Sequence, residues 1–250
     1  MRIVLDRWQG LGDNLQVSTI PRRMFDKYGE KCVWISDHVK YNNIETRQVV
    51  WEKNPFIAGF TDEPGVNLTS KLDWNIYNWI ERWERIYGVD ESYSQIPEVY
   101  LDGLDDDQFD VSNRVVADIS YSVTNFNKEI KNNKSRIDNY THHLENLLSQ
   151  SNKKIVIVNN INMKKQSTTP YANFLHALWP DVETETIDIQ SLNEYANIMN
   201  NCAQFVCAHS GQHSLASAVR KHNKKFICFI PKGFYDRGYF VFPNCRYIVI

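Results

Sequence analysis

Two short segments of the sequence combine glycine with side chains that can move a proton or hold a phosphate. The first, GLGD at residues 10–13, comes soon after the apolar run RIVL at residues 2–5. The second, HSGQH at residues 209–213, follows an apolar run that reaches Cys207. Open α/β sheets bind ligands at the carboxyl ends of their strands, so both segments stand where a site is expected.

The segment at residues 10–13 has two interpretations. In the first, Gly10 and Gly12 make a tight turn from strand to helix, and Asp13 caps the helix. In the second, Asp13 points into a cleft as a general base. The pattern lacks the third glycine of a dinucleotide-binding fingerprint, which disfavours an NAD-dependent oxidoreductase.

The segment at residues 209–213 is expected to start a helix. Free backbone N–H groups and the positive end of the helix dipole suit a phosphate there, and Ser210 and His213 would add side-chain donors. An ordinary helix cap with incidental histidines is the alternative. His209 and His213 are also spaced for a metal, but no third ligand stands at a convincing spacing.

A lysine pair, Lys164 and Lys165, follows the apolar run at residues 153–160. One or both of these lysines would meet a diphosphate if the loop faces a ligand site. A lysine pair in a loop is otherwise usually just solvated.

The surrounding pattern alternates strands and helices in both halves of the chain. Expected strands are residues 2–5, 31–36, 153–160, 185–189 and 224–231, with another in NPFIAGFT within residues 49–61 and another that ends at Cys207. Expected helices include residues 14–29, 168–180, 191–202 and 212–223. This predicts an α/β fold of two Rossmann-like lobes facing a cleft. A polar stretch at 125–138 places the boundary between a lobe at 1–135 and a lobe at 136–250.

An aromatic segment, WNIYNWIERWERIY at residues 74–87, has Trp and Tyr at helical spacing. Trp74, Tyr77, Ile80, Trp83 and Tyr87 would share one face of a helix. That face suits the protein core, and a membrane surface or a substrate is the alternative.

The composition limits the class of protein. The chain has 250 residues with a formal net charge of -2, which argues against non-specific binding to the phosphate backbone of nucleic acids. Its cysteines, 5 in number, include no C-x-x-C pair, so we expect neither a zinc nor a disulfide framework, and a reduced, intracellular setting. We expect neither a secretory signal nor a membrane span.

Together these segments resemble the ADP-heptose:lipopolysaccharide heptosyltransferases, the GT-B enzymes of glycosyltransferase family nine. The stretch SLNEYANIMNNCAQFVCAHSGQHSLASAV at residues 191–219 is similar to the family's donor-diphosphate turn. His209 stands where the family usually has Asp. The opening resembles the family's Gly-Asp start, in which the residue matching Asp13 is thought to act as base.

The resemblance implies roles for further residues. The expected donor-binding residues are Lys164, Lys165, His209, Ser210, Gly211, Gln212, His213, Arg237 and Gly238. The expected residues on the acceptor side of the cleft are Gly10, Gly12 and Asn14. Residues 74–87 occupy the region of a helix near the acceptor site. No cofactor and no metal are implied, because the nucleotide sugar is itself a substrate.

The implied reaction is sugar transfer from a nucleotide sugar to an acceptor hydroxyl, with inversion and without a metal. The expected acceptor is a cell-surface or lipid-linked glycan, as in lipopolysaccharide biosynthesis, and the expected location is cytoplasmic, with contact to the inner face of a membrane left open. A transferase acting on modified DNA bases, and a nucleotide-sugar-binding module without catalysis, are the alternatives.

Overall fold

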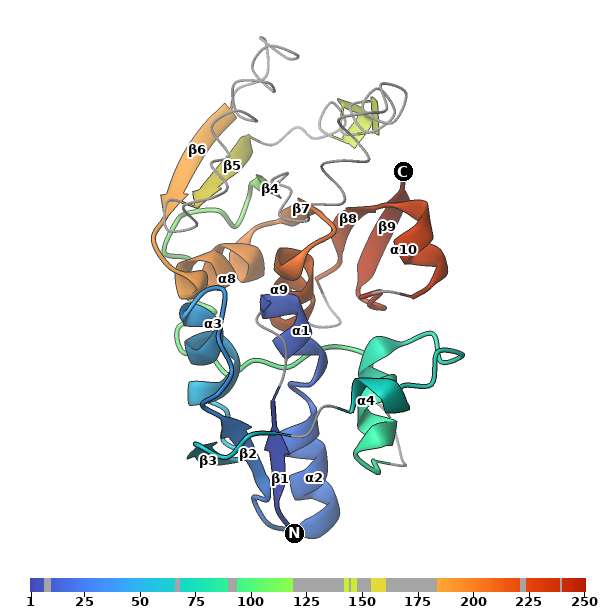
Figure 1. Cartoon of the computed structure of the whole chain (residues 1–250). Helices are drawn as coiled ribbons and strands as arrows, with labels where there is room; N and C mark the ends of the chain where they lie inside the picture. Colours follow the sequence, from blue (N-terminus) through green and yellow to red (C-terminus); the bar gives the residue numbers. More distant parts are fainter. Residues whose placement is uncertain are drawn as a thin grey trace.

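The computed structural model describes residues 1–6, 10–65, 68–89, 94–118, 142–143, 145–147, 154–160, 184–220, 224–238 and 240–250. These residues form two parallel β-sheets with helices packed around them (Figure 1). The α/β fold expected from the sequence is therefore confirmed.

The first sheet has the order β1-β2-β3 and all its strands run parallel. Its strands are β1 (Ile3–Leu5), β2 (Val33–Ser36) and β3 (Ile57–Thr61). Its helical segments are α1 (Leu11–Gln16), α2 (Ile20–Tyr28), α3 (Glu45–Arg47), the π-helix Gln48–Glu52 and the short 3-10 helix Thr69–Lys71.

The helix expected at residues 14–29 is broken in two. Pro21 lies in the first turn of α2, where its missing N–H group costs nothing, but it could not continue α1 without losing a hydrogen bond. Gly29 ends α2 in the left-handed conformation, with φ of 72°, as a glycine C-cap does.

The second sheet has the order β6-β5-β4-β7-β8-β9 and is also parallel. Its strands are β4 (Val115–Asp118), β5 (Ile155–Asn160), β6 (Thr184–Ile189), β7 (Gln204–Ala208), β8 (Phe226–Ile230) and β9 (Cys245–Val249). Counted from β4, this is the strand order of the Rossmann fold, whose ligand site lies at the reversal between β4 and β7.

The domain boundary expected at residues 135 and 136 does not agree with this sheet. Strand β4 precedes that boundary, yet it lies in the middle of the second sheet, between β5 and β7. The second lobe therefore begins with β4. The apolar run at residues 115–117 is so short that its strand is missing from the sequence prediction.

The aromatic helix is shorter than expected. Helix α4 spans Trp79–Ile86, and Asn78 caps it by accepting a hydrogen bond from the N–H group of Glu81. Trp74 and Tyr77 precede the helix and are exposed, because the Asp73 carboxylate holds a turn by accepting from the N–H group of Asn75. The prediction of one continuous helical face over 74–87 is therefore wrong at its start.

The helices of the second lobe are α8 (Leu192–Asn201), α9 (Gly211–Arg220) and α10 (Lys232–Asp236). Ser191 caps α8 by accepting from the N–H group of Glu194, as the expected capping box requires. At the other end of α8, the side-chain amides of Asn197, Asn200 and Asn201 donate to backbone carbonyls of residues 103–106 at 2.6 to 3.1 Å. The segment leading into β4 is therefore fastened to the second lobe.

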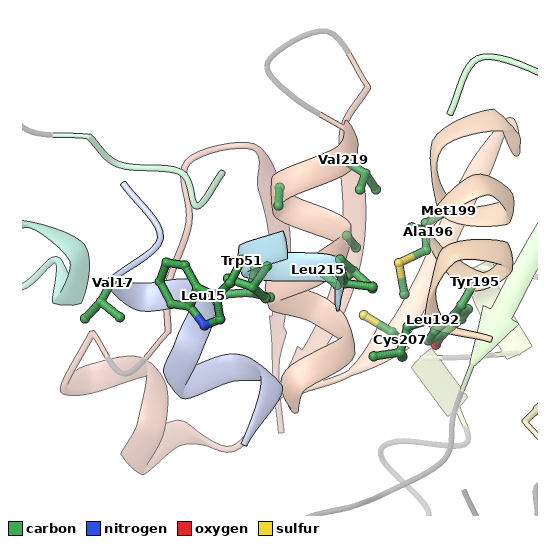
Figure 2. Close-up of a cluster of buried hydrophobic side chains, with 14 of the residues drawn as sticks. Leu15, Val17, Trp51, Leu192, Tyr195, Ala196, Met199, Cys207, Leu215 and Val219 are labelled. Carbon is green, nitrogen blue, oxygen red and sulfur yellow. The ribbon is translucent and has the colours of Figure 1, made fainter. Parts of the chain in front are cut away.

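One hydrophobic core runs through both lobes. Figure 2 shows Leu15 and Trp51 from the first lobe beside Leu215 of α9, with residues of α8 and β7 beyond. Each of the three named side chains is no more than 1% exposed. Helix α9 thus packs on the first lobe with one side and on α8 with the other.

Candidate active site

The two glycine segments meet at the junction between the lobes. Helix α1 begins after β1 and helix α9 begins after β7, and the starts of the two helices touch (Figure 1). A Cβ atom on Gly211 would lie 3.3 Å from the backbone nitrogen of Gly12, and a Cβ atom on Gly12 would lie 3.4 Å from the Cα atom of Gly211. A side chain at either position would be tight, so the two glycines favour this close approach of the backbones.

Asp13 lies in the first turn of α1 and is half-buried. The N-cap residue of α1 is Gly10, which has no side chain of its own to cap the helix. The Asp13 carboxylate folds back toward Gly10, where a Cβ atom would lie 2.8 Å from the carboxylate oxygen. Asp13 is therefore not the N-cap residue itself, although its carboxylate folds back over that position, and its place in the first turn of α1 puts it at the junction.

Asn14 does not lie on an acceptor-facing surface. Its side chain is 1% exposed, and its amide group donates to the Gly10 carbonyl at 2.9 Å. The amide oxygen accepts a hydrogen bond from the Trp51 indole at 3.0 Å. Asn14 thus holds the glycine turn on the core, and the expectation that it faces the cleft does not fit this packing.

The turn into α9 is closely packed. The Ser210 hydroxyl accepts a hydrogen bond from the N–H group of Gln212 at 3.3 Å, so it acts as a helix cap. The His209 ring stacks on Phe234 with centroids 5.2 Å apart. His209, Ser210 and Gln212 are each no more than 7% exposed. The turn lies at the Rossmann reversal point, beneath α1.

His213 is completely buried and holds the turn in place. Its Nε2 atom lies 2.7 Å from the Phe240 carbonyl oxygen, and its Nδ1 atom contacts the backbone N–H and carbonyl groups of Ser210. Burial lowers the pKa of His213 to about 4, so the ring is neutral near pH 7. Both nitrogens face backbone groups, so His213 positions the turn and offers no free donor to a phosphate.

The pH dependence of stability tests this assignment of His213. The native pKa of about 4 lies below the ordinary value of 6.5, so between these two values the unfolded chain binds a proton at His213 and the native protein does not. The contribution of neutral His213 to the free energy of unfolding is therefore fully present above pH 6.5. As the pH falls toward 4, this contribution decreases by about 3 kcal/mol. Urea unfolding of the protein and of His213→Gln, at about pH 7 and about pH 4.5, measures the difference. Equal losses in the two proteins would contradict the neutral ring.

Arg237 and Gly238 lie at the same junction, after α10. The Arg237 side chain is exposed, and its carbonyl oxygen accepts a hydrogen bond from the Arg82 guanidinium at 3.4 Å. Gly238 has φ of 64°, and a Cβ atom there would lie 2.2 Å from the Tyr77 carbonyl oxygen. Gly238 is thus required for the contact between the lobes. The Arg237 side chain remains available to a ligand.

Some residues of the site are absent from the sequence prediction. Phe240 joins the lobes, because it touches Gly12, accepts from His213 through its carbonyl group and stacks on Trp79 with centroids 6.1 Å apart. Asp118 ends β4 at the Rossmann reversal point, is 4% exposed and accepts a hydrogen bond from Tyr195. The sequence signal for Asp118 is a carboxylate directly after the short apolar run at residues 115–117.

Lys164, Lys165 and the helix expected at residues 168–180 lie outside the described residues. Their expected role in donor binding stays a prediction.

A cavity of about 600 Å³ lies elsewhere, between α2 and the segment at residues 94–100. None of the predicted site residues that the structure describes lines this cavity. Its polar groups bond to one another, since Arg22 pairs with Glu98 and Arg23 donates to Ser94 at 3.0 Å. We therefore place the candidate site at the junction of α1 and α9.

Two parallel α/β lobes that meet at α1 and α9 form the GT-B architecture of many glycosyltransferases. Three solved structures of glycosyltransferases are similar to this chain. A glycosyl transferase of family 9 from Veillonella parvula superposes with a TM-score of 0.63 at 12% identity, covering 100% of this chain and 85% of that one. The E. coli ADP-heptose LPS heptosyltransferase II has a TM-score of 0.59 at 10% identity, and the match covers 99% of this chain and 90% of that one.

The third structure is the iron-containing dodecameric glycosyltransferase TibC of enterotoxigenic E. coli, with a TM-score of 0.59 at 14% identity. The match covers 98% of this chain and 63% of TibC. No protein-family model matches the chain, and no curated protein does. At these identities the likeness establishes the fold. Within the described residues, no helix is long and apolar enough to cross a membrane.

Proposed function

We propose that this chain is a glycosyltransferase that moves a sugar from a nucleotide-sugar donor to an acceptor hydroxyl, with inversion and without a metal. The observation that carries the proposal is the contact between Gly12 and Gly211, in a fold shared with solved glycosyltransferases. It places the first turn of α1, which carries Asp13, against the start of α9, at the reversal point where Rossmann sheets bind ligands.

In the proposed reaction Asp13 takes the proton of the acceptor hydroxyl. The hydroxyl oxygen forms a bond to the anomeric carbon of the donor sugar, and the bond from that carbon to the diphosphate oxygen breaks. The diphosphate leaves with the bonding electrons and gains negative charge. The positive end of α9 and a lysine from residues 164–165 stabilise this charge.

The proposal requires the two lobes to move apart. His209, Ser210 and Gln212 are buried where α1 covers the start of α9. A diphosphate therefore reaches the α9 amides only when the contact between Gly12 and Gly211 opens. The acceptor, a cell-surface or lipid-linked glycan in this proposal, would enter on the side of the first lobe.

A thermal-shift experiment tests donor binding. The purified protein is heated with a panel of nucleotide sugars, free nucleotides and NAD, with and without EDTA. A donor at about 100 times its dissociation constant adds about 2.7 kcal/mol of stability, and we expect one nucleotide sugar to do so in EDTA. If no compound of the panel raises the melting temperature, the proposal is contradicted. Donor binding without transfer to any acceptor would instead favour a binding module without catalysis.

Lys164→Ala and Lys165→Ala refine the same experiment. At least one of them is expected to weaken donor binding about tenfold or more, because it removes a charge-assisted hydrogen bond to phosphate. An unchanged donor affinity in both would refute the phosphate role of the lysine pair. Lys53→Ala, a change in an exposed lysine that pairs with Asp102, is the control.

A further inference from the structure

An exposed aromatic patch lies between α4 and α10. We define the aromatic patch as Trp74, Tyr77 and Tyr235, whose relative exposures are 62%, 47% and 36%. The Tyr77 hydroxyl donates to the Tyr235 carbonyl oxygen at 2.8 Å, so the patch spans both lobes. Large aromatic side chains left in water at a junction between lobes indicate a binding surface.

A buried arginine holds the aromatic patch in one conformation. The Arg82 guanidinium donates to the carbonyl oxygens of Trp74, Ile76 and Arg237. Its Cζ atom also lies 5.3 Å from the centroid of the Trp74 ring. Arg82 is 3% exposed, and burial lowers its pKa. One face of the Trp74 ring is thus backed by a cation, so a ligand that stacks on the ring meets a surface already ordered.

The aromatic patch continues into the candidate active site. The Trp74 ring packs edge-on against Trp79 with centroids 5.5 Å apart, and Trp79 stacks on Phe240 at 6.1 Å. Phe240 in turn lies against Gly12, because a Cβ atom on Gly12 would be 3.1 Å from its ring. A chain of rings therefore leads from the patch to the junction that carries Asp13.

We propose that the aromatic patch is an acceptor subsite, at which the apolar face of a sugar ring stacks on Trp74 while the reacting hydroxyl of the same glycan lies near Asp13. This inference rests on the proposed transferase function. The ring-to-ring path separates Trp74 from Asp13, so the stacked sugar is a unit of the acceptor other than the one that reacts. The acceptor is thus an oligosaccharide rather than a single sugar.

The chemistry of the aromatic patch favours a glycan over a lipid surface. Its three exposed side chains are Trp and Tyr, whose N–H and O–H groups stand beside an apolar ring, as the hydroxyls of a sugar stand beside its apolar face. Its exposed neighbours carry both signs of charge, Lys71 and Lys232 against Asp73 and Asp236. Anionic membranes attract clusters of basic residues, whereas mixed polar groups suit sugar hydroxyls.

Saturation-transfer NMR tests the inference with a panel of soluble oligosaccharides of two to six units. The panel contains glucose, N-acetylglucosamine, mannose, rhamnose and heptose oligomers. We expect at least one to bind, Trp74→Ala to weaken that binding about tenfold, and Trp74→Phe to retain most of it. Tyr28→Ala removes another exposed aromatic ring, at the end of α2, and is expected to change nothing.

The outcomes separate this inference from the proposed function. Donor binding, measured by thermal shift, should be the same in Trp74→Ala and in the unchanged protein. If Trp74→Ala loses oligosaccharide binding but keeps donor binding, the result supports the acceptor subsite.

Two results would overturn the acceptor subsite. In the first, Trp74→Ala binds oligosaccharides as well as the unchanged protein does. In the second, the unchanged protein binds no oligosaccharide of the panel. Trp74-dependent binding to vesicles of phosphatidylethanolamine and phosphatidylglycerol, without oligosaccharide binding, would make the patch a membrane contact and also overturn it. A protein that binds oligosaccharides but no nucleotide sugar would contradict the proposed function alone.

Discussion

Replacing Asp13 by asparagine is expected to lower the rate of sugar transfer by about 10²- to 10⁴-fold, the usual contribution of a general base. Asparagine keeps the size of the side chain but cannot accept the proton of the acceptor hydroxyl. Asp13 lies in the first turn of α1, and the turn into α9 supplies the groups expected to hold the donor. Donor affinity should therefore stay within about twofold of its original value, which calorimetry measures beside a radiolabelled transfer assay.

Asp26→Asn is the matched control for this experiment. Asp26 is an exposed residue of α2 that pairs with Arg22, and its substitution makes the same change of charge away from the junction. The control should transfer sugar at nearly the original rate, since surface ion pairs contribute little. Transfer by Asp13→Asn at the rate of the control would remove Asp13 as the base.

Replacing Gly238 by alanine is expected to destabilise the protein by about 3 kcal/mol. The left-handed conformation at φ of 64° costs a residue with a Cβ atom about 1–2 kcal/mol. The new methyl group would also lie 2.2 Å from the Tyr77 carbonyl oxygen, and such overpacking costs about 1–3 kcal/mol. For a chain of this length the melting temperature should fall by about 6–12 °C in a calorimetric scan.

Substitutions at two other glycines separate the cost of the left-handed conformation from the cost of the steric clash with Tyr77. Gly88 has φ of 73° with nothing within 4 Å of a Cβ atom, so Gly88→Ala carries only the conformational cost, about 1–2 kcal/mol. Gly233 lies in α10 with open space and no positive φ, so Gly233→Ala should be neutral or slightly stabilising. A melting temperature of Gly238→Ala equal to that of Gly88→Ala would mean that the contact with Tyr77 is not needed.

Local patterns predict much of the fold. Strands β1, β2, β3 and β5 to β8 are visible as apolar runs, whereas β9 is missing from the prediction; the cap of α8 follows from Ser191 and Glu194 alone. The position of the two glycine segments also follows from local order, because a strand precedes each of them and parallel strands place their ligands at one edge. Neighbours in sequence carry these signals, so no distant contact is needed to read them.

Distant contacts decide the rest. Strand β4 is too short to be recognised, and only pairing with β5 and β7 makes it part of the sheet. The rings of His213 and Phe240 meet through a fold that brings residues 27 apart in the chain together, so the burial that lowers the pKa of His213 has no signal in its neighbours. Asn14 likewise becomes a core residue through Trp51.

The aromatic segment shows the same division. The helix predicted from its spacing is present from Trp79 onward, where packing against the core and against Phe240 stabilises it. Before Trp79, turns at Asp73 and Asn78 override the spacing and leave Trp74 exposed. Residue types and their order thus predict an α/β chain with two glycine turns that each follow a strand. Tertiary packing alone decides which side chains are buried as supports and which face a ligand, because burial depends on contacts between segments far apart in the sequence.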